Sequence, residues 1–549
     1  MGPCMSAPST TEVDYVIVGA GSAGCVLANR LTQSGRHRVL LLEAGGSDRR
    51  LFIQVPIGYG RTFNDPRVNW MYEAEPDATL ANRPQFWPRG KVLGGSSSIN
   101  AMVYIRGHPG DFDDWEAMGN PGWAYRDVLP YFRKLEDHAL GASEFHGTGG
   151  PVHVSDVSAQ VHPLCETFIA SCESLGIPRN PDFNGAAMEG AGLWHVNIKD
   201  GVRVSSASAY LRPALKRANL EVVTHAQATR VLFTGTRATG VEYVRGGARQ
   251  SVTAKREVIL SAGSMNSPQL LELSGIGDPR VLAGVGIPVV CDAPAVGEGL
   301  QDHLAVSYFY RSKVPTLNNQ LAPWTGKMKA ALRYALDRSG PLSMSVNQAG
   351  AFLRGRPDRA RPNLHLYFNP ASYSVTTVGS RRRLLNPDSF AGFLMSFNSC
   401  RPTSRGSVHV HSADPLIAPR IRANALSSDV DIEEVYEGAS LLRRISGAQP
   451  LAGVIESELK PGAKVLSDAE VLEDFRARAG SVFHSCSTCA MGPDARTAVV
   501  DHQLKVYGVA GLRVVDASVF PVVTSGNINT PTLMVAEKAA DLILKAVAE

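Results

Sequence analysis

The feature that most constrains this chain is a glycine-rich loop near its N-terminus, Gly19 to Gly24. Its sequence matches G-x-G-x-x-G, in which the first glycine permits a tight turn, the second lets the backbone approach a pyrophosphate, and the third lets a helix pack against a strand. A short apolar, β-branched run, Tyr15 to Val18, precedes the loop, and Ala23 to Leu31 follows it with helical spacing. Strand, glycine turn and helix in this order predict a binding site for an adenine dinucleotide.

A second strand completes this unit. Val39 to Leu42 is a continuous apolar run that ends at Glu43, about 20 residues beyond the loop, where an acid can hydrogen-bond a ribose hydroxyl group. Residues 14 to 43 are therefore predicted to form one βαβ unit with two parallel, doubly buried strands. The glycine pattern alone does not distinguish FAD from NAD.

Further strands of the same sheet are expected far along the chain. Several short β-branched runs lie between 220 and 261, a last short strand is expected at Leu512 to Asp516, and Thr532 to Val547 has the spacing of an amphipathic helix. The runs in the first of these regions are Leu220 to Val223, Arg230 to Phe233, Thr239 to Val244 and Val258 to Ser261.

The chain is too long for one hydrophobic core. It has 549 residues, whereas single cores stop growing near about 250 to 300 residues. Residues 306 to 480 carry mixed strand and helix signals, several prolines and no glycine pattern of the dinucleotide type. We therefore expect most of a second domain there.

Composition and charge exclude several kinds of partner. The formal net charge is only +4, and the longest basic run, Arg381 to Arg383, is expected in a solvated loop, so no nucleic-acid partner is predicted. No apolar stretch approaches the roughly 20 residues that cross a bilayer, so no membrane span is expected. The first ten residues lack the layout of a secretory signal, and the eight cysteines are scattered, as is typical of reduced thiols in a cytoplasmic protein.

Two later glycine-rich segments narrow the choice of cofactor. Gly90 to Asn100 is rich in backbone donors and hydroxyl groups, and Gly263 to Gly277 also begins and ends with glycines. Taken as structure alone, each segment predicts no more than a turn before a helix.

In this order and spacing, the two segments resemble the two signatures of the glucose-methanol-choline oxidoreductase family, position by position. The resemblance extends through Gly299 to His303, Ser404 to Val408, the segment after His484, and Asp516 to Ser518 with Pro531, and it is weakest between about 306 and 395. It implies a mixed α/β fold, with a Rossmann-like FAD-binding domain and a substrate-binding domain built on an antiparallel sheet flanked by helices. The first domain would comprise residues 12–156, 201–305 and 494–546, and the second residues 157–200 and 306–493.

The resemblance also implies which residues hold FAD. The loop from Gly19 to Gly24 and Glu43 would contact the adenosine and pyrophosphate, and the second glycine-rich segment would lie near the flavin. Several family members attach FAD through a histidine at the position of Ile99; since isoleucine has no nucleophile, noncovalent FAD is expected. The predicted cofactor-binding residues are Gly19, Gly21, Ser22, Ala23, Gly24, Glu43, Trp70, Gly95, Ser96, Asn100, Ala101, Met102, Val103, Ala228, Asp516 and Ala517.

His484 is the predicted catalytic residue. It begins a segment, HSCSTCAMG, that resembles the family's HxxGTxxMG, in which the histidine lies over the flavin and assists removal of the alcohol proton. An imidazole suits this role because its ordinary pKa of about 6.5 lets it exchange protons near neutral pH. The second family residue, a histidine or asparagine before the last helix, falls on Asn527, with Asn529 as the alternative register and a plain helix cap as the structural alternative.

One position departs from the family pattern. The family's glycine in GT is Ser487 here, next to an extra cysteine at 486, and this change could alter the backbone beside His484. Cys486 to Cys489 also reads as C-x-x-C, which is typical of a zinc half-site or a redox pair. Neither further ligands at close spacing nor a second nucleotide pattern for NAD(P)H accompanies it. No metal is therefore expected, and Cys489 is interpreted as ordinary packing.

The resemblance implies oxidation of a primary or secondary alcohol to an aldehyde or ketone. His484 would take the hydroxyl proton, the hydride would pass to flavin N5, and Asn527 would orient the substrate oxygen. Two alternatives remain open at this stage: a non-redox FAD enzyme such as a lyase or photodecarboxylase, and a flavin-carrying binding protein without turnover. The acceptor, whether oxygen, a quinone or another carrier, is not specified by any motif. Neither the alcohol nor the oligomeric state is specified either, and no acid is evidently placed for a choline-like cation.

Overall fold

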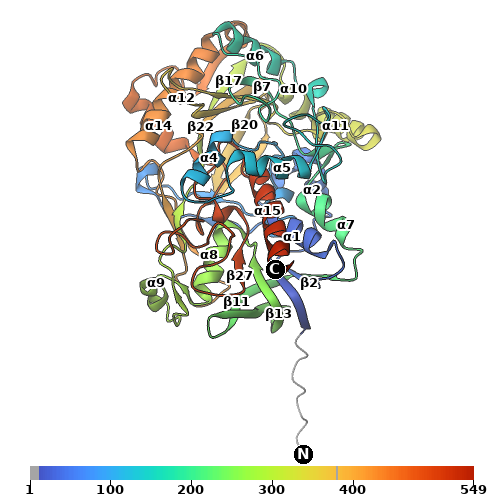
Figure 1. Cartoon of the computed structure of the whole chain (residues 1–549). Helices are drawn as coiled ribbons and strands as arrows, with labels where there is room; N and C mark the ends of the chain where they lie inside the picture. Colours follow the sequence, from blue (N-terminus) through green and yellow to red (C-terminus); the bar gives the residue numbers. More distant parts are fainter. Residues whose placement is uncertain (1–10, 379–380, 549) are drawn as a thin grey trace, which may run out of the picture.

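Two seven-stranded sheets, one above the other in Figure 1, organise the residues that the computed structural model describes, 11–378 and 381–548. Each sheet lies in a hydrophobic core of its own. The lower sheet contains the first strand of the chain, and the last helix packs beside it. The first ten residues, on which the expectation about a secretory signal rests, lie outside the described range.

The lower sheet has the order β10-β2-β1-β13-β12-β11, with β27 paired to β13. The pairs from β10 through β13 to β27 are parallel, and β13, β12 and β11 are antiparallel. Every predicted strand of this sheet is confirmed. The strands are β1 (Thr11–Val18), β2 (Val39–Glu43), β10 (Leu220–Thr224), β11 (Ala226–Thr234), β12 (Arg237–Arg245), β13 (Ala248–Leu260) and β27 (Leu512–Val514).

The glycine loop joins β1 to helix α1 (Ser22–Thr32), as the sequence predicts. All residues of β2 are buried, which explains why its sequence is a continuous apolar run. A Cβ atom at Gly24 would lie 1.9 Å from the carbonyl oxygen of Gly19, so only glycine lets the helix start this close to the strand.

Helix α15 (Asn529–Ala548) brings the end of the chain back to its beginning. It packs against α1, as the two helices in the centre of Figure 1 show. The contact includes a buried carboxylate, Glu537, which accepts hydrogen bonds from Arg30 Nη2 at 2.6 Å and from the Tyr210 hydroxyl group at 2.8 Å. The helix predicted at Thr532 to Val547 is thereby confirmed.

The upper sheet is antiparallel throughout, in the order β25-β17-β22-β19-β18-β7, with β26 paired to β17. Helices α6 (Leu164–Ser174) and α12 (Asp429–Gly447) pack on it (Figure 1). The expected antiparallel sheet with flanking helices is confirmed. Its strands are β7 (Gly190–Leu193), β17 (Leu304–Ser312), β18 (Ala349–Leu353), β19 (Leu364–Asn369), β22 (Gly392–Ser399), β25 (Ile455–Lys460) and β26 (Gly480–Ser481).

One expectation in this region is wrong. Arg381 to Arg383 begin a strand, β21 (Arg381–Pro387), which pairs with β20 (Tyr373–Val378), so the three arginines do not lie in a loop. The physical reason is the partner strand, which is rich in β-branched residues and supplies backbone hydrogen-bonding groups that a run of arginines alone does not reveal. The residues between the two strands, 379 and 380, lie outside the described range.

The domain boundaries stay a prediction. The lower sheet takes its strands from the three segments predicted for the first domain, and the upper sheet takes most of its strands from the segments predicted for the second. β17 begins at Leu304, just ahead of the predicted boundary at 306. In the part of the chain that the structure describes, no helix has both the length and the apolar character that crossing a membrane requires.

The remaining elements are short. The other helices are α2 (Leu51–Gln54), α3 (Tyr59–Thr62), α4 (Pro109–Ala117), α5 (Tyr125–Leu135), α7 (Arg212–Ala214), α8 (Gly263–Leu273), α9 (Pro279–Gly284), α10 (Leu317–Leu321), α11 (Trp324–Asp337), α13 (Leu451–Val454) and α14 (Asp468–Arg478). The other strands are β3 (Tyr72–Glu73), β4 (Phe86–Trp87), β5 (Glu136–His138), β6 (Val152–Val154), β8 (Ile198–Lys199), β9 (Val202–Arg203), β14 (Ile276–Gly277), β15 (Cys291–Asp292), β16 (Glu298–Leu300), β23 (Gly406–His409) and β24 (Arg420–Arg422).

Candidate active site

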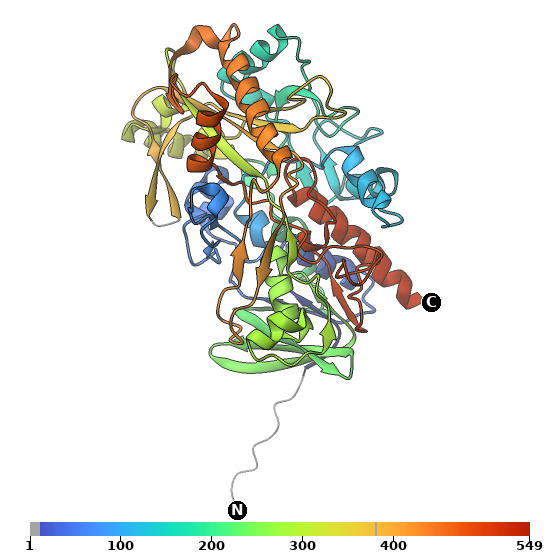
Figure 2. The same cartoon turned by 90° about the vertical axis from the view of Figure 1, so that its left-hand side faces the viewer.

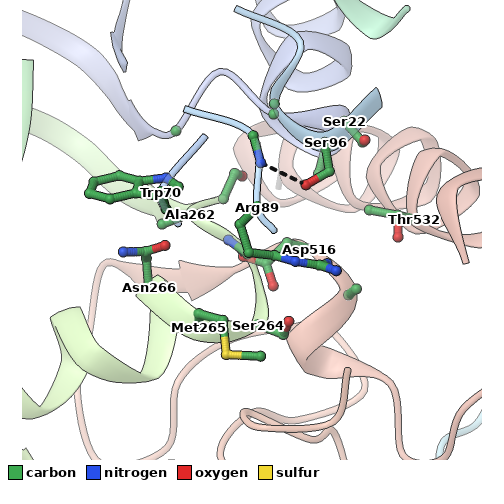
Figure 3. Close-up of a pocket in the computed structure, with 18 of the residues that line it drawn as sticks. Ser22, Trp70, Arg89, Ser96, Ala262, Ser264, Met265, Asn266, Asp516 and Thr532 are labelled. Carbon is green, nitrogen blue, oxygen red and sulfur yellow. Dashed lines mark hydrogen bonds between the residues drawn. The ribbon is translucent and has the colours of Figure 1, made fainter. Parts of the chain in front are cut away.

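A pocket extends from the glycine loop at the end of β1 to His484 and Asn527. Figure 3 shows part of its wall, including Ser22, Trp70 and Asp516. Of the residues predicted from sequence, Gly24 alone does not line it; that glycine packs behind the loop instead. The predicted residues that line the pocket are Gly19, Gly21, Ser22, Ala23, Glu43, Trp70, Gly95, Ser96, Asn100, Ala101, Met102, Val103, Ala228, His484, Asp516, Ala517 and Asn527.

The second glycine-rich segment closes directly on the first. The Gly94 N–H donates to the Ala20 carbonyl oxygen at 2.7 Å. Gly95 has a φ of +54°, and a Cβ atom on it would lie 2.6 Å from Gly21 Cα, so the approach requires glycine. The Gly90 N–H donates to Ser96 Oγ at 3.1 Å, the dashed line in Figure 3, and this bond fixes the hydroxyl group at the pocket wall.

Glu43 holds the glycine loop in place from the end of β2. Its carboxylate accepts hydrogen bonds from the N–H groups of Ala20 at 2.9 Å and Gly45 at 2.7 Å. Burial nevertheless raises the pKa of this carboxyl group to about 7, because the backbone bonds only partly offset the cost of desolvating the charge. The same side chain lines the pocket, where a ribose hydroxyl group would find an acceptor.

Three helices begin at the pocket wall. First-turn residues of α1, α8 and α15 all line it, including Ser22, Ser264 and Asn529. The N–H groups in a first helical turn lack partners within the helix, and the helix dipole places positive charge there. This concentration of positive helix ends fits the pyrophosphate of a dinucleotide.

The start of α8 also leaves room for a ligand. Gly263 has a φ of +85°, and a Cβ atom on it would meet nothing within 4 Å. Asp516 holds this turn by accepting from the Gly263 N–H at 2.9 Å and from the Ser267 hydroxyl group at 2.6 Å. The open space beside a rigid, donor-rich turn is a second observation that fits a bound dinucleotide.

The backbone that carries His484 is held from two sides. Asp302 Oδ1 accepts from the His484 N–H at 2.6 Å, and Arg89 Nη2 donates to the Phe483 carbonyl oxygen at 2.5 Å. Phe483 and Ser487 have φ angles of +71° and +73°, a conformation that costs non-glycine residues energy and is concentrated at functional sites. Ser487 therefore adopts a conformation that a glycine would adopt at lower cost.

A chain of hydrogen bonds assigns the protons on two histidines. The carbonyl oxygen of Cys400 can only accept, so His303 Nε2, 2.9 Å away, must carry the proton. The other nitrogen of the neutral His303 ring, Nδ1, is then an acceptor, and His484 Nδ1, at 2.9 Å, must donate to it. His484 Nε2 is left unprotonated and accepts from Asn527 Nδ2 at 3.0 Å.

The electrostatics of this chain favour neutral rings. Burial lowers the pKa of His484 well below its ordinary value, and nearby His303, His365 and Arg89 lower it further. Burial likewise lowers the pKa of His303 to about 4. Asn527 Oδ1 is buried without a hydrogen-bond partner among the residues of the described ranges. Nε2 of His484 thus carries an acceptor lone pair at the pocket wall, and the Asn527 amide occupies it in this structure.

Asn529, the alternative to Asn527, is not the asparagine that contacts His484. Asn529 lines the same pocket, but its Oδ1 accepts from Ser22 Oγ at 2.8 Å and so joins α15 to the glycine loop. Asn527 is the residue that contacts His484.

The two cysteines beside His484 are free and buried. Burial raises the pKa of the Cys486 thiol to about 12, and its sulfur accepts from Ser487 Oγ at 3.2 Å. Within the ranges 11–378 and 381–548, no group of three His, Cys, Asp or Glu residues is placed to hold a metal ion. Ile99 is buried among Ile53, Val68 and Val92 and does not line the pocket.

Sequence reasoning missed several residues of this site. Ser264, Met265 and Asn266 lie in the second family signature, and Asp302 and His303 lie in a motif that carried the resemblance, yet none received a role. Their motifs were the available signal. Arg89 precedes the second glycine-rich segment, and nothing in its sequence context marked it.

The comparisons with known proteins identify the family. Sequence models described as GMC oxidoreductase, the glucose-methanol-choline group, match residues 13–305 and 402–536. The chain belongs to the GMC oxidoreductase family. The resemblance and the fold inferred from the sequence are thereby confirmed.

Relatives match this GMC chain over nearly its whole length. Mitochondrial choline dehydrogenase of Homo sapiens is 44% identical over 544 residues, which cover 97% of this chain and 90% of the relative. An alcohol dehydrogenase (acceptor) of Pseudomonas putida is 41% identical over 538 residues, covering 97% and 96%. The solved structure of pyridoxine 4-oxidase from Mesorbium loti superposes with a TM-score of 0.87 at 33% identity, covering 96% and 98%. The chain is an FAD-dependent GMC enzyme that oxidises an alcohol.

Proposed function

We propose that this GMC enzyme oxidises an uncharged primary or secondary alcohol, with His484 as the base that accepts the hydroxyl proton. The proposal rests on the series of hydrogen bonds from the Cys400 carbonyl oxygen through His303 to His484, because this series leaves Nε2 of His484 unprotonated at the pocket wall. Asn527 is the only hydrogen-bond partner of Nε2 among the described residues. As a neutral amide, it cannot compete for the proton.

The roles of the residues follow from these contacts. FAD, when bound, would supply the two-electron acceptor for the hydride of the alcohol carbon. The substrate hydroxyl group would replace the Asn527 amide as the donor to His484 Nε2 and lose its proton there, and the displaced Asn527 N–H group would donate to the substrate oxygen and orient it. His303 accepts the Nδ1–H bond throughout and keeps the ring in one orientation.

The cofactor is held without a covalent bond in this proposal. The loop from Gly19 to Gly24 and Glu43 would hold the adenosine and pyrophosphate end, and Gly95, Ser96 and the residues from Asn100 to Val103, which line the same pocket, would lie by the flavin. Ile99 has no nucleophilic atom, and its side chain packs in an apolar cluster.

The charges around the pocket favour an uncharged substrate. The carboxylates that line it are Glu43 and Asp516, and both accept backbone N–H groups that shape the dinucleotide cradle. The pocket is also lined by Met102, Val103 and Phe483, and the cation of Arg89 lies near His484. Aromatic rings are present, since Phe483 contacts Phe63 and Phe63 contacts Tyr59. Both carboxylates, however, are already bound to backbone N–H groups, so neither is placed to pair with a quaternary ammonium ion.

The test is anaerobic stopped-flow mixing in the dark with a panel of uncharged alcohols and with choline. At least one uncharged alcohol should bleach the oxidised flavin with saturating kinetics, and choline should be poorer by about 100-fold or more in rate constant over dissociation constant. Choline as the best substrate would refute the uncharged-alcohol proposal. Bleaching or product formation only under light would favour a photochemical, non-redox enzyme instead.

The electron acceptor and compartment complete the proposal. Oxygen, a quinone or another carrier would reoxidise the flavin, and a second mixing step with each identifies which one does so.

The cysteines in the described ranges are all free thiols, which supports a reducing, cytoplasmic environment.

A further inference from the structure

Helix α11 turns an apolar stripe toward solvent. Trp324, Met328, Leu332 and Leu336 follow one another at intervals of four residues, and they are 70%, 60%, 61% and 78% exposed. Residues four apart lie on one side of a helix, so the four side chains form a continuous row. Ala331 and Ala335, also exposed, fall on the same side. Surface helices of globular proteins normally turn such a row toward the core.

The opposite side of α11 attaches it to the molecule. Ala330 and Tyr334 are its buried residues, and the Tyr334 hydroxyl group donates to the Gly201 carbonyl oxygen at 2.9 Å. Ala330 packs in a small cluster with Leu317 and Leu321. The helix therefore projects from the edge of the molecule, as Figure 1 shows on the right and Figure 2 on the left. The stripe makes no contribution to holding it there.

Positive charge borders the stripe on both sides. Lys327 and Arg338 fall on one side of it by helical spacing, and Lys329 and Arg333 fall on the other. All four are exposed, and Asp337 is the one acidic residue from 324 to 338. An apolar row between basic side chains, in a helix too short and too charged to span a bilayer, is the pattern of a helix that lies in a membrane interface. Long basic side chains can keep their charges at the lipid headgroups while their stems stay apolar.

We propose that α11 docks this enzyme on the surface of an anionic lipid bilayer, with the stripe from Trp324 to Leu336 buried at the interface. The charge complementarity of the basic borders selects anionic phospholipid over a neutral surface. The inference is independent of which alcohol is oxidised.

The docked face adjoins the wall of the active site. Ile57 packs in the cluster beneath α11, and Tyr59, which follows closely in the chain, packs with Met102 and Val103 of the pocket wall. The segment from Ile57 to Tyr59 thus connects the cluster beneath α11 to the cluster that contains residues of the pocket wall.

Vesicle sedimentation with the purified holoenzyme tests the proposal. The enzyme should pellet with vesicles of phosphatidylcholine and phosphatidylglycerol, less with phosphatidylcholine alone, and less as salt is added, because salt screens surface charges. The triple variant Trp324→Ser, Met328→Ser, Leu332→Ser should bind the anionic vesicles at least about tenfold more weakly. Lys329→Gln with Arg333→Gln should weaken binding to anionic vesicles and leave the weak binding to neutral ones unchanged.

A matched control removes exposed leucines elsewhere. Leu140 and Leu466 are 60% and 72% exposed and lie outside α11, so Leu140→Ser with Leu466→Ser should bind as the wild type does. All variants should keep their FAD content and their rate of flavin reduction, because none of these residues lines the pocket.

Three results would overturn the proposal. The first is a wild-type enzyme that does not pellet with anionic vesicles at low salt, and the second is a triple variant that still binds them fully. The third is a loss of oligomeric state in the triple variant by sedimentation velocity without lipid, which would make the stripe a contact between copies of the chain.

Discussion

At His484 the decisive proton is the one on Nδ1, because it is donated in a hydrogen bond to His303 and Nε2 is thereby left unprotonated. His303 in turn is fixed by the Cys400 carbonyl oxygen, which cannot donate. His303 does not line the pocket, so it acts on the reaction through the orientation and protonation of His484. It is a positioning residue.

Removing His303 should slow flavin reduction and change its pH dependence. In the wild type, the low pKa of His484 keeps Nε2 unprotonated as the pH falls. The acid limb of the pH profile, where protonation of His484 slows flavin reduction, should therefore lie well below pH 6.5. His303→Ala removes both an acceptor and a neighbour that lowers the pKa of His484. Its rate should fall about 10- to 100-fold, and its acid limb should move to higher pH.

The conservative variant separates positioning from packing. His303→Gln can still accept from His484 and donate to Cys400, so it should recover part of the rate, although it too removes the ring that helps to lower the pKa of His484. Equal losses in both variants, with no change in the pH profile measured by stopped flow, would show that His303 serves packing alone.

The backbone at Ser487 is strained, and the cost of this strain to the stability of the protein can be measured. Its φ of +73° costs a serine about 1 to 3 kcal/mol, part of which glycine's greater freedom in the unfolded chain offsets. Ser487→Gly should therefore stabilise the holoenzyme by up to about 1 kcal/mol, seen as a higher midpoint in a thermal melt. Ser487→Ala keeps the Cβ atom and should give no gain. A lower midpoint for the glycine variant would mean that the Ser487 hydroxyl contacts outweigh the strain.

At the scale of elements, the site depends on helices that are far apart in the chain. α1, α8 and α15 all begin at the pocket, and α15 is tied to α1 by the buried carboxylate of Glu537. Breaking a buried ion pair by removing one partner leaves the other charge without compensation. The start of α15, with Asn527 just before it, relies on this contact.

Glu537→Ala should be strongly destabilising. It leaves the half-buried Arg30 and the buried Tyr210 hydroxyl group without their acceptor, and the free energy of unfolding should fall by about 3 kcal/mol or more. The measurement is the thermal midpoint together with the FAD retained after gel filtration. Asp541→Ala, which removes a more exposed partner of Lys134 on the same helix, should change stability by less than about 0.5 kcal/mol. Equal effects of the two substitutions would contradict the importance of the buried pair.

The sequence allowed the elements of the lower sheet to be predicted because each carries a local pattern. β2 is a continuous apolar run since both of its faces are buried, and the glycines before α1 meet steric limits that no other residue meets. The hairpin that contains Arg381 and the outward orientation of α11 were not predictable in this way. The strand at Arg381 depends on pairing with the neighbouring strand β20, and the orientation of α11 depends on the absence of a packing partner for its apolar stripe among the described residues.

Contacts between residues that are far apart in sequence also limited what could be predicted of the site. His484 and Asn527 were found because their motifs resemble the family's, and the structure places them in contact. The contact of His303 with His484 joins residues that are far apart in sequence, and no spacing rule predicts it. The tautomer of His484 became readable only when the partner of each ring nitrogen was known.

At the scale of the whole molecule, the site forms where the two sheets meet. His303 and Cys400 lie at the ends of β17 and β22 in the upper sheet, whereas Asn527 leads into α15 beside the lower one. The proton-accepting chain is thus anchored in one layer, and the dinucleotide pocket is built mainly from the other. Catalysis requires both layers, which explains why the resemblance to the GMC family spans nearly the whole chain.

The most direct test of this account is a single-turnover comparison of the wild type with His484→Ala. Each enzyme is mixed anaerobically with the best alcohol from the panel, after its FAD content has been measured on denaturation. The account predicts that the variant keeps its FAD, which contacts many other residues, and reduces the flavin about 100- to 10,000-fold more slowly. A variant that reduces its flavin at the wild-type rate would show that His484 is not the base.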